Sequence, residues 1–493
     1  MRWLVVVAAV WACASDKPGD SAEGAPTSTE TDAGIGAGTG TGAGTGTGAG
    51  TGTGAGTGSG TGTGTGTGGT PTPPDCAALP LLDDGLIPVV ELFVDPAGDD
   101  AADGSRDTPL QTIRQAASMA RPGTAIRLLP GEHGGGHFIE DLHGSGGAPI
   151  WLGGAPGAPL PTLTASGGQI LHLVRPQHVV LHDLIGRGGT DNGINIDDGG
   201  ATDAEVAHDL LIRNLDIADV GTGGNEDCLK VSGVYRFTVV DSAFARCGAG
   251  GSAIDFVGGH EAVVARNTFT DLGSTGVQAK GGSADIAIHW NRFTNAGARG
   301  VNMGGSTGFE FFRPPLDPVG DNAEAWRIRV WGNVFEGGET PFAFVGCVDC
   351  EAVHNTIVRP TSWATRILQE TTSAEGYTFL PVQNGRFANN VVVFEVGAWS
   401  RAVNVGPDTL PETFVFSHDL WFADDDPARS AVDLPVAETA GIVGADPLLS
   451  LDGALGPGSP ALKSGTPIAW AQAGIDGLCF GDPPNRGAAG GGG

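Results

Sequence analysis

The segments Arg266-Asn267-Thr268-Phe269, Trp290-Asn291-Arg292-Phe293 and Gly332-Asn333-Val334-Phe335 repeat one pattern, in which an asparagine and one variable residue precede a phenylalanine. Related segments flank them, and an Asn or Asp marks each unit at Asn214, Asp241, Asn267, Asn291, Asn333, Asn355 and Asn390. Successive marks are 27, 26, 24, 42, 22 and 35 residues apart. This spacing predicts a solenoid that carries two loop insertions.

The repeated units predict strands rather than helices. They show no helical period, and short runs of Val, Ile and Phe alternate with small or polar residues between Gly, Asn and Asp. Asn tolerates left-handed backbone, and its amide can bond the Asn of the next coil, so we expect an Asn ladder at one corner. One such coil cannot bury its own apolar face, so the units must stack into parallel sheets around a shared core.

From about Phe93 to about Leu462 the chain resembles the right-handed parallel β-helix of the pectate-lyase-like superfamily. An amphipathic segment precedes the repeats, with Thr108 as the expected N-cap and Pro109 as the first helical residue. This short N-terminal helix resembles the caps of extracellular β-helix proteins. Solenoids need such a cap because an open end exposes core and strand edges. The expected fold class is therefore all-β, a right-handed parallel β-helix (solenoid) with a short N-terminal capping helix.

Composition divides the chain further. A tract from about Ala33 to Gly69 alternates Gly with Thr or Ala and predicts a flexible tether. We expect a signal peptide over 1–14, a disordered linker over 15–74, a cap over 75–124, the β-helix over 125–465 and a C-terminal tail over 466–493.

The first residues resemble a bacterial targeting signal, in which Arg2 precedes an apolar run from Trp3 to Ala12. Two cleavages stay open. Val10-Trp11-Ala12-Cys13 resembles a lipobox, which implies a lipid on Cys13, whereas Ala12-Cys13-Ala14 fits ordinary signal cleavage before Ser15. The tether favours the lipoprotein, so we expect a protein at the outer membrane or cell surface, and otherwise a secreted one.

The net charge limits the classes of binding partner, and the cysteine count limits the disulfide bonds. The formal charge of −30 argues against nucleic acid and against anionic membrane surfaces, which leaves a lipid as the one expected membrane contact. We expect a monomer. Beyond Cys13 an even number of cysteines predicts disulfides, with 15 pairings open among Cys76, Cys228, Cys247, Cys347, Cys350 and Cys479. A zinc site at Cys347, Cys350 and His354 is the alternative.

Any chemistry is expected on the outer face of one sheet. Strand segments that begin at Asn195, Cys228, Ile254, Val277 and Val301 fall in successive coils when they are aligned on their glycine endings. Alternation then points Val277 and Ala279 inward, and Gln278 and Lys280 outward. The neighbouring coils present Asp255 and Asn302 on the same face.

Lysine is scarce, with only Lys17, Lys230, Lys280 and Lys463 against 22 arginines. Lys230 and Lys280 occupy nearly equivalent places two coils apart, or roughly 10 Å. That spacing suits a groove for a sugar chain, and we expect Lys280 to face solvent within it.

This arrangement resembles that of β-helix polysaccharide lyases, which abstract the proton beside a uronate carboxylate with a basic side chain. The resemblance implies Lys280 as the base, with Arg299 and Lys230 as the other catalytic candidates. The family neutralises the uronate carboxylate with calcium or with a second basic side chain, and both stay open here. For calcium, oxygen ligands could come from Asp197, Glu226, Asp227 and Asp255. Gln278 and Asn302 would contact the polysaccharide. Of the two insertions, the first carries Phe309, Phe311 and Phe312, which would stack on sugars or pack against the sheet, and the second, from Glu370 to Arg386, would form the other wall.

Three functions remain open at this point. The leading one is a surface-tethered β-helix that cleaves an acidic, uronate-containing glycan by β-elimination. The second is a non-catalytic binding or structural module. The third is a glycoside hydrolase that uses Asp197, Asp227 or Asp255. The segment Asn225–Gly233 is similar to the Asp-Asp-Cys strand of polygalacturonases, but their His-Gly and Arg-x-Lys elements are absent, which disfavours inverting hydrolysis.

Overall fold

The computed structural model describes residues 76–202, 205–221, 223–450 and 452–491. The predicted signal peptide, the lipid site at Cys13 and the Gly/Thr-rich linker lie outside these residues and stay predictions. Within the described residues, no helix is both long and apolar enough to cross a membrane.

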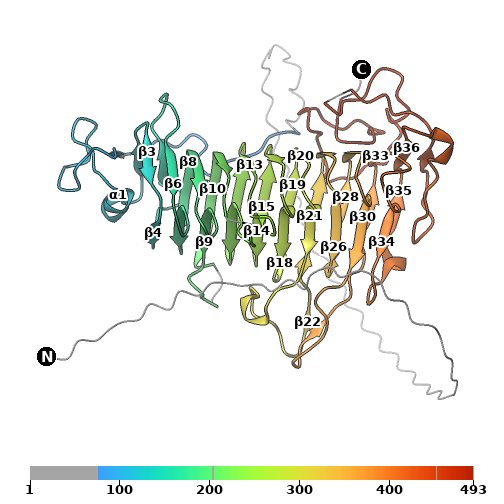
Figure 1. Ribbon diagram of the computed structural model, residues 1–493, viewed down its shortest axis with the longest axis horizontal. Coiled ribbons are helices and arrows are strands. Elements are labelled where there is room, and N and C mark those ends of the chain that lie inside the picture. Colours follow the sequence, from blue (N-terminus) through green and yellow to red (C-terminus); the bar gives the residue numbers. More distant parts are fainter. Residues whose placement is uncertain (1–75, 203–204, 222, 451, 492–493) are drawn as a thin grey trace, which may run out of the picture. The chain divides into compact units, whose positions relative to one another are not determined.

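The predicted all-β parallel solenoid is confirmed. Strands of successive coils pair in parallel and stack along one axis (Figure 1). One face is a ten-stranded sheet, here called sheet B. Its strands, in spatial order, are β4 (His137–Glu140), β7 (Leu171–Val174), β9 (Ile194–Asp197), β11 (Leu229–Ser232), β14 (Ser252–Val257), β17 (Thr275–Lys280), β21 (Arg299–Gly304), β26 (Phe342–Val345), β30 (Thr365–Leu368) and β34 (Val403–Val405).

A 25-stranded sheet, here called sheet A, forms the remaining faces as two adjoining columns of strands. The short strands β18 (Ser283–Ala284), β23 (Ala325–Trp326) and β27 (Cys347–Val348) pair at the start of the first column. The long strands β8 (Gln177–Gly188) and β10 (Ala207–Ala218) run through both columns. The first column also holds β1 (Val90–Val94), β2 (Thr124–Leu128), β5 (Ile150–Gly154), β12 (Val234–Val240), β15 (His260–Ala265), β19 (Ala287–His289), β24 (Arg329–Trp331), β28 (Glu351–Val353), β32 (Arg386–Ala388) and β35 (Val415–Ser417). The second holds β3 (Glu132–Gly134), β6 (Thr162–Ala165), β13 (Ala243–Ala245), β16 (Thr268–Thr270), β20 (Arg292–Thr294), β25 (Val334–Glu336), β29 (Thr356–Val358), β33 (Val391–Phe394), β36 (Leu420–Ala423) and β37 (Ile442–Val443).

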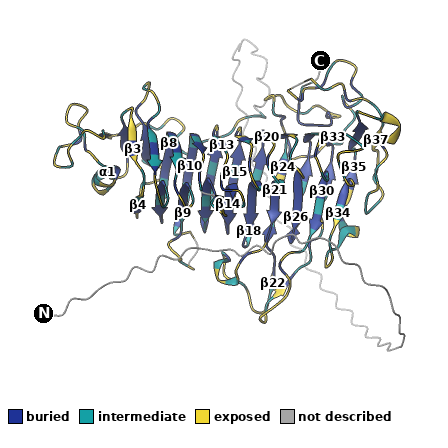
Figure 2. Cartoon of the chain, in the orientation of Figure 1, coloured by how far each residue is buried: buried dark blue, intermediate teal, exposed yellow. Residues whose placement is uncertain are grey.

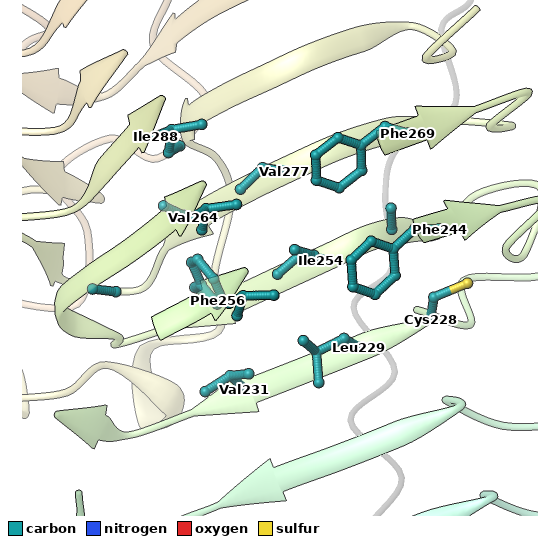
Figure 3. Packing of buried hydrophobic residues seen from close by; sticks show 14 of the residues in the cluster. Cys228, Leu229, Val231, Phe244, Ile254, Phe256, Val264, Phe269, Val277 and Ile288 are labelled. Carbon is teal, nitrogen blue, oxygen red and sulfur yellow. The ribbon is translucent and has the colours of Figure 1, made fainter. Parts of the chain in front are cut away.

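The core fills the space between these faces, and its strands are buried along the solenoid (Figure 2). The phenylalanine of each repeat lies inside the coil, where Phe269 stacks on Phe293 at 4.5 Å and Phe293 on Phe335 at 4.4 Å. Figure 3 shows Phe244 beside Phe269, with Leu229, Ile254 and Val277 from sheet B facing the same interior. Burying each such side chain stabilises the fold by roughly 1.5–3 kcal/mol.

The Asn ladder is confirmed from Asn267 onward. The backbone N–H of Asn267 donates to Asn291 Oδ1 at 2.9 Å, and Asn291 donates in the same way to Asn333. Equivalent bonds continue from Asn333 to Asn355, Asn390 and Asp419.

The ladder positions expected at Asn214 and Asp241 were wrong by one residue. These two residues have φ of 50° and 53° and form the left-handed corner itself. The ladder continues one position later, where Ser242 accepts the N–H of Leu215.

The capping helix α1 (Ile113–Met119) is present, but it begins later than expected. Its N-cap is Thr112, whose hydroxyl accepts from Gln115 N–H at 3.1 Å. The predicted N-cap, Thr108, instead donates to Asp103 within a loop. Leu110 is held in extended backbone by a bridge to Val94, and this pairing delays the helix.

The C-terminal segment packs on sheet A rather than projecting from it. Ile468 and Ala471 contact Val353 and Ala388 in a small apolar cluster. Disulfides link Cys76 to Cys479, Cys228 to Cys247 and Cys347 to Cys350. The last of these bridges consumes both thiolates of the alternative zinc site.

Both predicted insertions leave the solenoid on the same side, where β22 (Asp321–Asn322) lies in Figure 1. The first follows β21 and the second follows β30. They join through pairing of β22 with β31 (Thr378–Phe379).

Candidate functional site

A row of polar side chains follows the outer face of sheet B. Because the strands pair in register, one position in each of six successive coils falls in line, and all six positions alternate with core residues. This outer row consists of His172, Asn195, Lys230, Asp255, Gln278 and Asn302. At ~4.8 Å between strands it extends over roughly 24 Å. Gln278 and Asn302, which were expected to contact a polysaccharide, are buried, as are Asn195 and Asp255.

Lys230 is the centre of the row. Its ammonium lies 2.5 Å from Asp255 Oδ2 and 3.3 Å from Asp227 Oδ2, and its side chain is 15% exposed. Asp227 precedes β11, where its other oxygen accepts the N–H of Ser252 at 2.7 Å. The backbone bends at the start of β11 and directs the Asp227 side chain toward the row. The two-residue alternation of the strand does not predict this direction.

The two ionisable neighbours have shifted pKa values. The pKa of Asp227 is raised to about 6, mainly by burial and also by the nearby charge of Asp255, while Lys230 opposes the rise. Burial alone would lower the pKa of Lys230, but the carboxylates of Asp255 and Asp227 outweigh it and hold that pKa above its ordinary value. Lys230 is therefore a fixed cation, and Asp227 is the group that changes its protonation near neutral pH.

Lys280 points away from the core as predicted, but it does not face solvent. Its side chain is 6% exposed, and its ammonium lies 3.8 Å from Asp255 Oδ2. The backbone of the first insertion crosses above it, since a Cβ at Gly305 would lie 3.3 Å from both Lys280 Cδ and Gln278 Nε2. The expectation of an open groove at Lys280 was wrong because the insertion folds back over the strand ends.

The two lysines are also not equivalent in register. Lys230 aligns with Asp255 and then with Gln278, so Lys280 lies two residues further along its strand. They nevertheless meet, because both ammonium groups contact the carboxylate of Asp255.

Arg299 does not accompany Lys280. It aligns with Thr275, five residues before Lys280 in β17, and ion-pairs with Glu370 of the second insertion at 2.6 Å. Its other contact is a hydrogen bond to Asn302 Oδ1 at 3.2 Å. Arg299 therefore holds Asn302 and Glu370 of the second insertion, and its backbone lies at the start of β21, away from Lys280.

The four predicted calcium ligands do not converge. Asp197 bonds His172 and Asn195, each at 2.6 Å, while Glu226 accepts the N–H of Gly224. Asp227 and Asp255 share the ammonium of Lys230, which stands where a metal ion between them would stand. These residues do not fit a calcium site, and the chain supplies the cation itself.

The aromatics of the first insertion pack against the second. Phe312 is 2% exposed, and Phe379 lies 5.6 Å from it and 5.4 Å from Phe309. Phe309 and Phe311 are half-buried. Of the two expected roles, stacking on sugars or packing within the protein, Phe312 has the second, because its ring is not accessible to a sugar.

Glu324 was not identified from the sequence, where it is one acid between two alanines. It is 1% exposed and accepts hydrogen bonds from Gly281 N–H and from the N–H and hydroxyl of Thr307. The hydroxyl of Thr371, in the second insertion, donates to Oε1 of Glu324, which also accepts the N–H of Thr307. Glu324 thus ties both insertions to the strand end next to Lys280.

A cavity of about 470 Å³ opens near the other end of these strands. Val220, Gly221, Cys247 and Gly248 are among its lining residues. Gly221 and Gly248 also approach the carboxylate of Glu226, the neighbour of Asp227 in the chain. The cavity and the insertions therefore lie on opposite sides of the outer row.

Comparisons with known proteins agree with this architecture. Residues 170–313 match the family model described as "Right handed beta helix region". In fold the chain is similar to pectate lyase Pel9A, with a TM-score of 0.53 and 15% identity over 84% of this chain and 99% of that one. Other similar structures are a rhamnogalacturonan lyase (TM-score 0.40, 13% identity, 65% and 86% covered) and an alginate lyase from Paenibacillus sp. str. FPU-7 (0.39, 14%, 65% and 96%). No curated protein matches the sequence. The expected right-handed, pectate-lyase-like β-helix is thereby confirmed, and these identities show the fold alone.

Proposed function

We propose that the outer row binds an acidic polysaccharide and that the protein cleaves it by β-elimination beside a uronate carboxylate. The observation that carries this proposal is the contact between Lys230, whose side chain is 15% exposed, and Asp227, whose side chain is 6% exposed and whose pKa is raised to about 6. Unlike Lys280, Asp227 directly adjoins the partly exposed ammonium. The amides of Asn195, Gln278 and Asn302 are buried, so they support the row from beneath. His172 and Lys230, with side chains 21% and 15% exposed, are the members of the row that would contact the polysaccharide. The fold shared with pectate lyase Pel9A supports the same class of substrate.

In this mechanism Lys230 binds and neutralises the uronate carboxylate, which makes the adjacent carbon more acidic. Asp227 in its ionised form takes the proton from that carbon, the neighbouring C–O glycosidic bond breaks, and a C=C bond forms in the product. The leaving oxygen takes its proton from solvent. A general base works best when its pKa is near the working pH, as that of Asp227 is.

The catalytic role expected for Lys280 becomes a positioning role in this proposal. Lys280 is enclosed beneath Gly305 and contacts the same carboxylate, that of Asp255, as Lys230 does. Lys280 therefore helps to fix Asp255, and Asp255 in turn fixes the ammonium of Lys230. No calcium is needed, since Lys230 supplies the positive charge. Chelation of divalent ions should therefore leave the activity unchanged.

Hydrolysis is the second candidate, and one observation favours it. Asp227 and Asp255 flank the same ammonium, and one of the two has a raised pKa, which is the arrangement of an acid and its partner carboxylate. The pH dependence separates the two reactions. Asp227 as a base gives activity that rises through pH 6, and as an acid gives activity that falls there.

The test is incubation of the purified protein with pectate, alginate and glycosaminoglycans, with and without a chelator. Elimination gives products that absorb in the ultraviolet, whereas hydrolysis gives new reducing ends without that absorbance. Binding without either product supports a non-catalytic module. Neither binding nor cleavage of any acidic glycan contradicts the proposal.

We also propose that the protein works outside the cytoplasm, tethered by a lipid on Cys13. Three disulfides support this location, since such bonds persist in oxidising compartments. Replacing Cys13 with Ser should release a folded protein from the membrane fraction. Retention of the variant in membranes contradicts the lipid anchor.

A further inference from the structure

Two histidines and an aspartate meet on sheet A, where β8 and β10 begin. His178 of β8 lies opposite Asp209 of β10, because the flanking residues of the two strands pair in register. His208 Nδ1 is 2.6 Å from Asp209 Oδ2, and His178 Nδ1 is 3.8 Å from the same oxygen. One donor atom from each of the three residues lies within 4.8 Å of the others.

One of these donor atoms lacks a hydrogen bond. His178 Nδ1 is buried and has no partner within hydrogen-bonding distance. Buried polar atoms are nearly always paired, and this unpaired ring nitrogen lies 3.8 Å from a carboxylate oxygen, where it is available to a ligand.

The donor set indicates the chemical class of that ligand. Two imidazoles and one carboxylate bind zinc and related divalent transition metals and leave further positions open. Bond lengths of about 2.0–2.1 Å place tetrahedral ligands roughly 3.3 Å apart. The separations of the two Nδ1 atoms from Asp209 Oδ2, 2.6 and 3.8 Å, bracket that value. All three side chains are half-buried, which leaves access for an ion.

Arg236 contacts Asp209 mainly through the carboxylate oxygen that faces away from the histidines. Its Nε donates to Asp209 Oδ1 at 3.0 Å, while Nη1 donates to Glu205 at 2.9 Å. This pairing leaves Oδ2 directed at the histidines, apart from one longer contact with Nη2 at 3.3 Å. With Glu205 and Asp209 both ionised, the local charge is negative. Hydrogen bonds of this kind commonly orient a ligating carboxylate.

We propose that His178, His208 and Asp209 form a binding site for a divalent transition metal ion such as zinc, which would clip two successive coils together. The site lies on sheet A and does not depend on the activity proposed for sheet B. It differs from the expected calcium site in its position and in its imidazole ligands.

The test is zinc binding to the full-length protein, purified without a histidine tag and freed of metal with a chelator. Titration calorimetry should show one zinc ion per chain with micromolar or tighter affinity. His178→Ala and His208→Ala should each weaken binding at least about tenfold. His143→Ala is the matched control, since His143 also lies beside an aspartate, Asp141, but outside the cluster, and it should bind as the wild type does.

Cobalt provides a second readout. Cobalt(II) in the site should give a visible absorption band that His178→Gln removes, and melting curves without metal establish that each variant is folded. Wild-type protein that takes up no zinc at 100 μM would overturn the proposal. Zinc affinity that survives both histidine substitutions would overturn it equally.

Discussion

The ammonium of Lys230 lies 2.5 Å from the carboxylate of Asp255 in the next coil. The contact joins two strands of sheet B through ionised side chains that are almost enclosed. It also fixes the position of the one partly exposed cation in the outer row. Stability and function are therefore coupled at this pair.

Replacing Lys230 with Ala should destabilise the protein by roughly 3–5 kcal/mol, because it removes the ammonium that the buried carboxylates of Asp227 and Asp255 share. Chemical denaturation at pH 7.5 measures the change. Lys463→Ala is the matched control, since Lys463 is exposed, and it should change stability by less than about 0.5 kcal/mol. Equal effects of the two substitutions would show that the buried pair does not matter to stability.

The stability of the wild type should depend on the pH through Asp227. Its pKa is raised from 3.8 to about 6 in the folded protein, so its contribution is fully present below about pH 4 and is lost as the pH rises through 6. Asp227→Asn is neutral throughout. Relative to the wild type, the variant should therefore gain on the order of 3 kcal/mol between pH 4 and pH 7.5.

Asp285→Asn is the control of opposite sign, because the hydrogen bond from Arg327 lowers the pKa of Asp285. This variant should lose stability relative to the wild type as the pH rises over the acidic range. A stability difference between Asp227→Asn and the wild type that does not vary with pH would show that Asp227 is not perturbed.

The ladder at the solenoid corner should be sensitive to single substitutions. Asn291→Ala removes the acceptor of Asn267 N–H and leaves buried backbone groups unpaired, at a cost of about 2–4 kcal/mol. Asn404→Ala, which removes one half-buried hydrogen bond with Arg366, should cost less than about 1 kcal/mol. Denaturation midpoints compare the two, and similar losses would argue against a special role for the ladder.

The fold could be predicted because its determinants are local and periodic. Asn267, Asn291 and Asn333 mark one corner, and the alternation of Val277, Gln278, Ala279 and Lys280 correctly separates core from outer face. Errors of one residue, as at Asn214 and Asp241, arise because Asn and Asp suit both the left-handed corner and the ladder position.

The site could be predicted only in part. Aligning the strand segments of this chain with one another placed Lys230, Asp255, Gln278 and Asn302 on one face. The alternation of residues does not show which segments cover that face. The path of the insertion over Lys280 depends on Glu324, whose partners are distant in sequence. The contact of Asp227 with Lys230 likewise depends on a bend before the strand.

Glu324→Ala should loosen both insertions while leaving the solenoid intact. The substitution removes the acceptor shared by Gly281, Thr307 and Thr371. Limited proteolysis should then cut within residues 305–322 and 370–382 faster than in the wild type. Glu336→Ala is the control, since Glu336 is exposed in β25, and it should leave the cleavage pattern unchanged. Unaltered cleavage in Glu324→Ala would show that the insertions are held by other contacts.

The most direct test of the central claim is the rate of product formation from an acidic polysaccharide between pH 4.5 and 8.5, for the wild type and for Asp227→Asn. We predict unsaturated products from the wild type, with a rate that rises through pH 6 and does not change on chelation. Asp227→Asn should be slower by at least about 100-fold at pH 7.5, the usual contribution of a general base. Equal rates for the two proteins, or a wild type that acts on no acidic polysaccharide, would contradict the account.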